Sequence, residues 1–203
     1  MARTGPRLYT QYTLHSACEQ ADDESTPPAL RRVLRTLRAA RAQLAPGGAF
    51  AHCGDFSLSG RTSTQLAWYG KGAKYAKHRD VLEMDDSEDR RVFTAVYYLN
   101  DRANGGELRM HATKEWTDGS GHFDLEPKLD RLVLFDARNE HEVLESLGEN
   151  RMALTQWWYG APRSLRPLPP CVCTPLPPCV DNKETIFVSV ASYRDREQVP
   201  LTR

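Results

Sequence analysis

The sequence places a histidine and an aspartate two residues apart, at His78 and Asp80. Side chains two residues apart on an extended strand point to the same side, so this imidazole and this carboxylate converge on one point. Imidazole nitrogens and carboxylate oxygens are both ligands of transition metals. A His-x-Asp pair is common by chance, so it predicts a metal site only together with a third ligand elsewhere in the chain.

His141 is the best candidate for that third ligand, because it follows the apolar run Leu132-Val-Leu-Phe135, which is typical of a buried strand. Two histidines and one carboxylate on one face of a metal leave open positions, as in non-heme Fe(II) sites. The stretch His141-Glu-Val-Leu-Glu145 lacks the second histidine of a zinc-protease helix. The other histidines are weaker candidates: His111; His122, expected to be solvated in a Gly-Ser-Gly-His turn; and His15 and His52, which have no evident partner.

Arg151 follows a turn-like segment, residues 145–150, which predicts a hairpin that returns the chain to the neighbourhood of His141. Alternation along the next strand places Arg151 on the same face as Ala153, Thr155 and Trp157. An arginine that points into a β-barrel needs an anion, and a guanidinium binds a carboxylate bidentately. The combination predicts a metal together with a small molecule that carries a carboxylate.

The segment from Arg61 to Tyr159, about half of the chain, resembles the prolyl hydroxylase domain of the Fe(II)- and 2-oxoglutarate-dependent dioxygenases. The similarity is to the cytosolic, oxygen-sensing type, which includes the hypoxia-inducible-factor prolyl hydroxylases and their protist relatives. The matching strings, in chain order, are Tyr75-Ala-Lys-His-Arg-Asp80, Val96-Tyr-Tyr-Leu-Asn100, Gly105-Gly-Glu-Leu-Arg109, Leu125-Glu-Pro-Lys-Leu-Asp-Arg-Leu132, His141-Glu-Val143 and Arg151-Met-Ala-Leu-Thr-Gln-Trp157.

This resemblance implies roles for particular residues. It implies His78, Asp80 and His141 as ligands of Fe(II), and it implies that Arg151 and Tyr98 bind the distal carboxylate of 2-oxoglutarate. The other residues expected around the cosubstrate are Tyr69, Thr155 and Trp157, and those expected around a substrate proline are Arg91, Thr94, Val96 and Trp157. Thr94 and Val96 are included because their side chains are small enough to admit a pyrrolidine ring.

The implied reaction uses O2 and 2-oxoglutarate, with ascorbate, to convert a proline of a cytosolic protein into 4-hydroxyproline, with succinate and CO2 as products. The acidic segment 85–89 departs from the family pattern, which leaves the identity of the substrate open. Two alternatives therefore stay open. One is a dioxygenase of the same fold that acts on another protein residue or on a nucleic-acid base, and the other is a non-catalytic binding module.

The elements that must position these residues are a helix and several short strands. Thr26 is a suitable N-cap, Pro27 suits the first helical turn and Pro46 ends the helix. Its apolar residues recur at helical spacing on one face: Leu30, Val33, Leu34, Leu37 and Leu44. The expected strands are 64–69, 92–99, 107–110, 131–136 and 152–159. This pattern predicts a mainly β fold with flanking helices, and the resemblance narrows it to a double-stranded β-helix, or jelly roll.

Four segments follow from these boundaries: a flexible arm over 1–25, the dioxygenase domain over 26–162, a Pro-rich linker over 163–181, and a last segment over 182–203. A strand is expected near 186–190, at the start of a further domain. The last segment, 182–203, resembles the start of a cytoplasmic hydroxyproline N-acetylglucosaminyltransferase, through Ile186-Phe-Val-Ser-Val-Ala-Ser-Tyr-Arg-Asp195. In protists such transferases modify the adaptor subunit of SCF-type ubiquitin ligases. That adaptor is therefore the expected substrate. Cys171, Cys173 and Cys179 of the linker lack a fourth ligand for a structural metal.

Composition limits the classes of partner. The 203 residues include 27 Lys plus Arg and 27 Asp plus Glu, so the formal charge is zero, which argues against a nucleic-acid binder. The arginines between residues 31 and 41 are accordingly expected to form a solvated helix face. No apolar run is long enough for a membrane span and no signal peptide is evident. The five cysteines are expected to be reduced thiols, which predicts a cytoplasmic or nuclear protein. The protein is also expected to be a monomer.

Overall fold

The computed structural model describes residues 9–14, 22, 24–44, 48, 56–81, 89–101, 104–111, 120–162 and 187–189. One helix and ten strands make up the described part of the chain. In order they are β1 (Tyr9–Leu14), α1 (Pro28–Ala42), β2 (Phe56–Tyr69), β3 (Tyr75–His78), β4 (Arg90–Tyr98), β5 (Leu108–His111), β6 (His122–Leu125), β7 (Leu132–Asp136), β8 (His141–Val143), β9 (Arg151–Pro162) and β10 (Phe187–Ser189).

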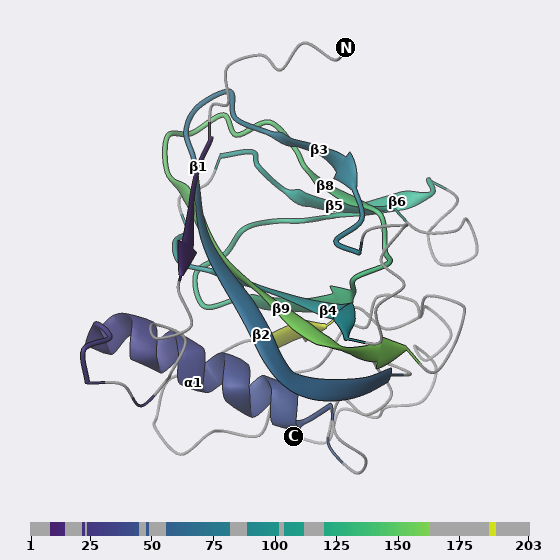
Figure 1. The fold of residues 1–203 in the computed structure, drawn as a ribbon. Helices are drawn as coiled ribbons and strands as arrows, with labels where there is room; N and C mark the ends of the chain where they lie inside the picture. Colours follow the sequence, from purple (N-terminus) through teal and green to yellow (C-terminus); the bar gives the residue numbers. More distant parts are fainter. Residues whose placement is uncertain are drawn as a thin grey trace, which may run out of the picture.

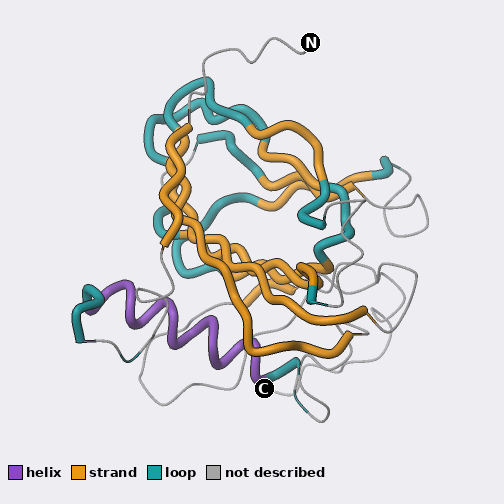
Figure 2. Tube along the Cα trace, in the orientation of Figure 1, coloured by secondary structure: helices purple, strands orange, loops and turns teal. Residues whose placement is uncertain are grey.

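The strands form two sheets that face each other (Figures 1 and 2). The larger sheet has the strand order β1-β2-β9-β4-β7-β10, and the smaller sheet has the order β3-β8-β5-β6. Every pairing is antiparallel except that of β10 with β7. Strands that follow one another in sequence repeatedly lie in different sheets, which is the double-stranded β-helix, or jelly roll, that the resemblance implied. The fold prediction is confirmed.

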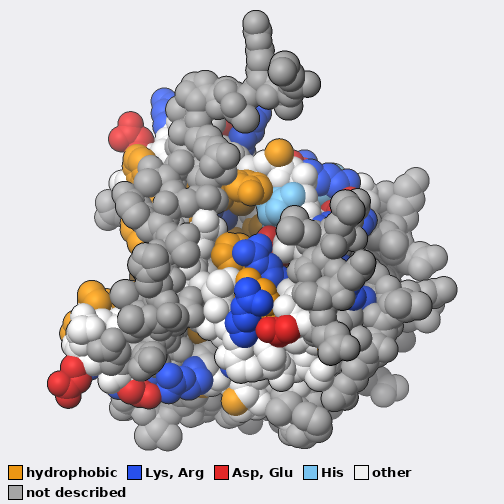
Figure 3. Space-filling model, viewed as in Figure 1, with side chains coloured by type: hydrophobic (Ala, Val, Ile, Leu, Met, Phe, Trp, Pro, Cys, Tyr) orange, Lys and Arg blue, Asp and Glu red, His pale blue; other side chains and the backbone are white. Residues whose placement is uncertain are grey.

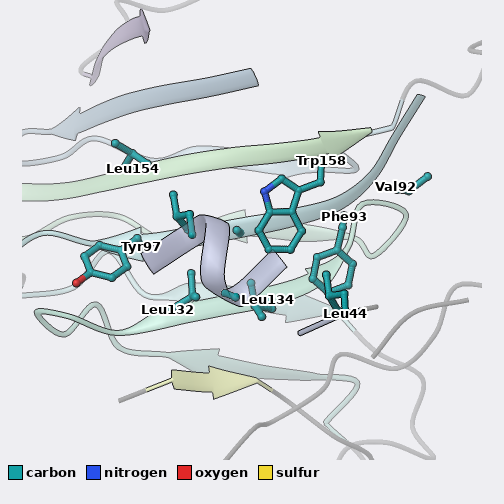
Figure 4. Close-up of a cluster of buried hydrophobic side chains, with 11 residues drawn as sticks. Leu44, Val92, Phe93, Tyr97, Leu132, Leu134, Leu154 and Trp158 are labelled. Carbon is teal, nitrogen blue, oxygen red and sulfur yellow. The ribbon is translucent and has the colours of Figure 1, made fainter. Parts of the chain in front are cut away.

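Helix α1 packs on the outer face of the larger sheet (Figure 1). Leu37 and Ala40 of the helix are fully buried, and they pack in one cluster with the side chains of the sheet that point away from the smaller sheet. Figure 4 shows this cluster, in which the ring of Phe93 stacks on Trp158 with ring centroids 5.5 Å apart. The helix therefore closes the core on the side opposite the space between the sheets.

The space between the two sheets holds a second cluster. Its members come from both sheets and are the inward-facing residues of four strands: Val96, Tyr98, Leu108, Met110, Val133, Phe135 and Ala153. The inward face is the one on which alternation had placed Arg151 and Ala153, and both are 2% exposed. Polar side chains on this face therefore sit in an apolar surround between the sheets.

Several predicted boundaries are wrong for identifiable reasons. Residues 9–14 lie in the segment predicted to be a flexible arm, yet they form β1, which pairs with β2 over Tyr9–Leu14. Thr26 does not cap the helix: the N-cap is Pro27, without a side-chain hydrogen bond, and the Thr26 hydroxyl is buried without a partner among the described residues. The helix ends at Ala42, and Pro46, which was predicted to end it, lies outside the described residues.

The strands are longer than predicted where they pair with a long neighbour. The strand predicted over 64–69 begins at Phe56, because β2 follows β9 along its whole length. Strands β3, β6 and β8 were not predicted, since each has only three or four residues and none has the alternation that marks a longer strand. These short strands belong to the smaller sheet.

The tail contributes one strand where a strand was predicted. Phe187–Ser189 pairs in parallel with Leu132–Leu134 at the edge of the larger sheet. The division of the chain at 163 and the separate identity of 182–203 stay predictions, and the three linker cysteines lie outside the described residues. Among the described residues, no helix has both the length and the apolar character needed to cross a membrane.

Candidate metal centre and carboxylate site

His78, Asp80 and His141 come together at one end of the space between the sheets. His78 ends β3, Asp80 follows two residues later, and His141 begins β8, the neighbour of β3 in the smaller sheet. One ligand atom from each of the three lies within 4.8 Å of the others. Pairing of His78 with His141 across the two strands explains why residues so distant in sequence meet.

Backbone carbonyls fix the orientation of both imidazoles. Nδ1 of His78 lies 2.8 Å from the carbonyl oxygen of Ala76, and Nδ1 of His141 lies 3.0 Å from that of Asn139. A carbonyl can only accept, so each Nδ1 carries the proton and each Nε2 keeps its lone pair. Both Nε2 atoms face Asp80, at 3.5 Å from Oδ1 and 3.6 Å from Oδ2. This is the tautomer that a metal ligand requires.

The carboxylate of Asp80 is held by a third contact. The hydroxyl of Thr94 donates to Oδ2 at 2.7 Å, and Thr94 is completely buried. The indole N–H of Trp157 is buried without a hydrogen-bond partner at normal distance among the described residues, and the nearby indole N–H helps to lower the pKa of Asp80. The structure thus gives Thr94 a role in positioning Asp80, and the substrate contact predicted for Thr94 stays a prediction.

The charge states of Asp80 and His141 suit a cation. Burial alone would raise the pKa of Asp80, but the contacts with His78, His141 and Thr94 outweigh it and lower the pKa to about 2. Burial lowers the pKa of His141, which keeps that ring neutral. Burial also acts to lower the pKa of His78, but its contacts with Asp80 and the carbonyl of Ala76 more than offset this, so its pKa is raised.

A buried guanidinium lies on the other sheet. Arg151 begins β9 and is 2% exposed. Its Nε donates to the carbonyl oxygen of Gly106 at 2.6 Å, and its Cζ lies 4.5 Å from the centre of the Tyr69 ring and 5.3 Å from that of Tyr98. No carboxylate pairs with it among the described residues. A buried cation without a carboxylate is costly, so the site requires an anion from outside.

Tyr98 and Gly106 shape the space around this guanidinium. The Tyr98 hydroxyl is buried and has no hydrogen-bond partner among the described residues, and burial raises its pKa, so it remains a neutral donor. Gly106 has a φ of +71°, and a Cβ there would lie 2.6 Å from Cδ of Arg151. The glycine thus makes room for the arginine. Sequence reasoning had quoted this glycine only as part of a matching string.

Ring contacts connect the guanidinium with the three ligands. Tyr69, against which Arg151 lies, belongs to a cluster with Val143 that also includes Tyr75. The Tyr75 ring is 4.4 Å from that of His78, centre to centre. On the other side, the ring of Phe135 packs edge-on against His141 at 4.7 Å. The triad and the arginine therefore open on the same space.

The predicted hairpin between His141 and Arg151 is wrong, although both residues face the space between the sheets. β8 pairs with β3 and β5 in the smaller sheet, whereas β9 pairs with β2 and β4 in the larger one. The turn at 145–150 carries the chain from one sheet to the other. A sequence cannot distinguish such a crossing from a hairpin, because both need only a turn between two strands.

The remaining predicted residues lie on two neighbouring strands of the larger sheet, β4 and β9. Thr155 pairs with Val96 across β9 and β4. Val96 is 7% exposed and packs in the cluster between the sheets. Arg91 lies over Trp157, with Cζ 4.0 Å from the ring, and donates from Nη1 to the backbone oxygen of Asp80 at 3.5 Å. Direct contacts of these residues with a cosubstrate or substrate stay predictions.

His111 and His122 are not part of the triad. They pair across β5 and β6 in the smaller sheet, and His111 lies 3.0 Å from Glu142 through Nε2. His122 was expected in a solvated turn, but it begins a strand and is only partly exposed. His15 and His52 lie outside the described residues.

The residues present fit an Fe(II) ion and a 2-oxoglutarate molecule. Two neutral imidazoles and an ionised carboxylate are the donor set of non-heme Fe(II) sites with open positions. Arg151 and Tyr98 offer a guanidinium without a carboxylate and a hydroxyl without an acceptor, which together fit a carboxylate. His78, Asp80 and His141 would hold the metal, and Arg151 and Tyr98 would hold the cosubstrate.

Comparison with known proteins agrees with this chemistry. Residues 64–159 match the 2OG-Fe(II) oxygenase superfamily, a range that contains the triad and Arg151. Among solved structures, a Pseudomonas putida prolyl-4-hydroxylase is 28% identical, with a TM-score of 0.54, over 74% of this chain and 70% of that one.

Two further structures are similar. A Trichoplax adhaerens prolyl hydroxylase, solved with a hypoxia-inducible-factor oxygen degradation domain peptide, is 25% identical, with a TM-score of 0.51; the match covers 76% of this chain and 64% of that one. A viral collagen prolyl hydroxylase of Paramecium Bursaria Chlorella virus-1 is 18% identical over 76% of this chain and 81% of that one, with a TM-score of 0.50, and shares the fold.

Proposed function

We propose that the chain, an Fe(II)- and 2-oxoglutarate-dependent dioxygenase by the match of residues 64–159 to the 2OG-Fe(II) oxygenase superfamily, hydroxylates a proline of a protein substrate. The observation that carries the proposal is the similarity, at 28% and 25% identity, to two prolyl hydroxylases. One of these was solved with a peptide, which supports a protein as the substrate.

The residues of this chain would divide the work as follows. His78, Asp80 and His141 hold the metal at the opening of the space between the sheets, and Fe(II) bound there supplies the oxidation of a C–H bond by O2 with 2-oxoglutarate. Arg151 and Tyr98 fix the far carboxylate of 2-oxoglutarate, which orients its other end toward the triad. The apolar inward-facing side chains keep water away from the reacting atoms.

We also propose a substrate, an accessory reductant and a location for this protein, each supported by the sequence alone. The tail's resemblance to a hydroxyproline N-acetylglucosaminyltransferase suggests a fusion of consecutive steps, with the adaptor of an SCF-type ubiquitin ligase as the substrate. Ascorbate is proposed as an accessory reductant, as in the oxygen-sensing enzymes that the sequence resembles. A cytoplasmic or nuclear monomer is also proposed, and the neutral formal charge supports a substrate other than nucleic acid.

The test is hydroxylation of defined proteins by the purified chain. The adaptor and unrelated cytosolic proteins are incubated with Fe(II), 2-oxoglutarate and O2, with and without ascorbate. Mass spectrometry should find a gain of one oxygen atom on one proline of the adaptor, and amino-acid analysis should identify 4-hydroxyproline. Asp80→Ala, which removes a metal ligand, is the inactive control. Oxygen on another residue type would refute proline hydroxylation, and oxygen on another protein's proline would refute only the adaptor.

A further inference from the structure

A strip of alternating arginine and aromatic side chains lies beside the triad. It consists of Arg61, Tyr159, Arg91 and Trp157, which we call the arginine strip. The Arg61 guanidinium lies over the Tyr159 ring at 4.0 Å, and the Arg91 guanidinium lies over the Trp157 ring at 4.0 Å. Nε of Arg91 donates to the Tyr159 hydroxyl at 3.3 Å, which joins the two stacks. Ser63 contacts the same hydroxyl at 3.1 Å.

Arg91 is a cation whose described contacts contain no carboxylate side chain. Its partners are the Tyr159 hydroxyl, the Trp157 ring and the backbone oxygen of Asp80, so the guanidinium contacts the backbone of a proposed metal ligand. The stacked and bonded arrangement fixes the plane of the guanidinium, so its remaining N–H groups are presented in a set direction. A fixed fork of this kind is the usual receptor for a carboxylate.

The surroundings of Arg91 carry a positive excess. A small pocket beside it is lined by Phe56, Arg90, Arg91, Val92, Asp136 and Arg138. Asp136 is the single carboxylate there, and Arg138 binds it with distances of 2.5 and 2.9 Å. At the other end of the strip, Arg61 lies 3.6 Å from Asp89, and their side chains are 59% and 44% exposed. An exposed pair of this kind is weak and is easily exchanged for another anion.

Figure 3 shows basic side chains gathered next to a histidine on the exposed surface, in a molecule whose formal net charge is zero. A positive field that is confined to one place on a neutral protein favours a substrate with a local negative charge. It does not favour a polyanion, which needs an extended basic surface.

We propose that the arginine strip is a specificity subsite that binds the carboxylate of an acidic residue flanking the target proline. The inference rests on the proposed peptide substrate. Arg91 supplies the main contact and Arg61 the outer one, while Tyr159 acts as a positioning residue through its hydroxyl. Because one extended residue spans about 3.3–3.6 Å, an anion that meets Arg91 lies within about two or three residues of the proline.

The test measures peptide binding by calorimetry to the protein loaded with Fe(II) and 2-oxoglutarate in the absence of O2. Peptides differ only in one position, Glu or Gln, which is moved along the three residues on each side of the proline. At one position the Glu peptide should bind wild-type protein about tenfold more tightly than its Gln counterpart at low salt. The ratio should fall as salt is added, because exposed charges are screened.

Variants locate the effect. Arg91→Gln should bring the Glu-to-Gln ratio close to one, mainly by weakening the Glu peptide, whereas Arg91→Lys should retain part of it. Arg61→Gln should lower the ratio partially. Tyr159→Phe, which keeps the ring and loses the hydroxyl, should reduce the preference without removing it. Arg32→Gln, an exposed cation on α1 at the outer face of the sheet, is the matched control and should leave the ratio unchanged.

The outcomes separate this inference from the proposed function. Equal affinity of the Glu and Gln peptides at every position would overturn the inference even if proline is hydroxylated. A Glu preference that survives Arg91→Gln would also overturn it. An Arg91-dependent preference without oxygen transfer to proline, when O2 is admitted, would support the subsite and refute the proposed function.

Discussion

At the scale of single residues, the geometry of Asp80 depends on a neighbour that is not a ligand. Thr94→Val keeps the shape of that neighbour but removes the hydroxyl that bonds Oδ2 at 2.7 Å. We expect Fe(II) affinity to fall by about 10–100-fold, the usual effect of losing such a partner. Binding measured by chelator competition tests this.

Thr64→Val is the control for that variant. Thr64 is also fully buried and accepts a hydrogen bond from Gln156 at 3.0 Å, on the face of the sheet that does not carry the triad. Its loss should lower the free energy of unfolding by about 1–3 kcal/mol, like that of other buried partners, without changing Fe(II) affinity. Equal metal affinities for the two variants would remove Thr94 from the site.

Gly106 allows a second test at this scale, because its hydrogen occupies the space next to Arg151. In Gly106→Ala, the new Cβ would lie 2.6 Å from Cδ of Arg151 and the residue would keep a φ of +71°. The left-handed backbone alone costs about 1–2 kcal/mol with a side chain. We expect weaker 2-oxoglutarate binding by calorimetry as the guanidinium is displaced. Gly60→Ala, where a Cβ meets nothing within 4 Å, should leave that affinity unchanged.

The pH dependence of metal binding should follow His78. A metal needs the neutral imidazole, so affinity is full above the pKa of the ligand and falls as the pH drops below it. Asp80, with a pKa of about 2, stays ionised, and burial keeps His141 neutral, whereas the pKa of His78 is raised above 6.5. As the pH is lowered, Co(II) binding followed by absorbance should therefore begin to weaken while the pH is still above 6.5. Onset only at lower pH would contradict the raised pKa.

Residue types and spacing predicted the candidate ligands better than the groups that hold those ligands in position. His78, Asp80, His141 and Arg151 were each expected because imidazole, carboxylate and buried guanidinium carry recognisable chemistry. Thr94 was expected to touch a substrate because its side chain is small. Its bond to Asp80 was not predicted, since no sequence signal names the acceptor of a buried threonine. The carbonyls that orient the imidazoles carry no side-chain signal at all.

At the scale of elements, α1 stabilises the larger sheet from outside. Leu37 is fully buried between the helix and that sheet. Leu37→Ala should lower the free energy of unfolding by about 2–5 kcal/mol, through lost burial and a cavity. Leu129→Ala, at a leucine that is 47% exposed, should change it by less than about 0.5 kcal/mol. Denaturant unfolding measures both, and similar losses would mean that α1 is not packed on the sheet.

Long elements were predictable because their periodicity is long enough to read, as for the apolar face of α1 and the run in β7. The strands that carry the histidine ligands were missed. β3 and β8 have four and three residues, and their strand geometry comes from pairing with each other rather than from their own residue types. The same dependence on a partner explains β1, whose pairing with β2 could not be foreseen from residues 9–14 alone.

At the scale of the whole molecule, the two binding functions are divided between the sheets. The histidine ligands belong to the smaller sheet, and Arg151 and Tyr98 belong to the larger one. A molecule that spans from triad to arginine therefore touches both sheets. The cluster between the sheets joins them, and α1 packs on the outer face of the larger sheet alone. Sequence could not assign strands to sheets, because each crossing needs only a turn.

The tail provides the last prediction. All residues proposed to bind Fe(II) and 2-oxoglutarate lie between 69 and 157, and the tail adds three residues, β10, at the outer edge of β7. A chain ending at Pro162 should therefore keep its Fe(II) and 2-oxoglutarate affinities. Its free energy of unfolding should fall by at most about 3 kcal/mol, since each cross-strand pair contributes about 0.2–1 kcal/mol.

In the full chain, Val188→Pro should reproduce that loss of stability, because proline cannot donate to the ladder that pairs β10 with β7. Succinate formation and denaturant unfolding of the truncated chain, the proline variant and wild type decide the outcome. If the truncated chain loses its cosubstrate affinity while the proline variant keeps it, residues beyond 162 other than β10 support the site. The boundary predicted at 163 would then be wrong, since a segment that supports the site belongs to the same domain.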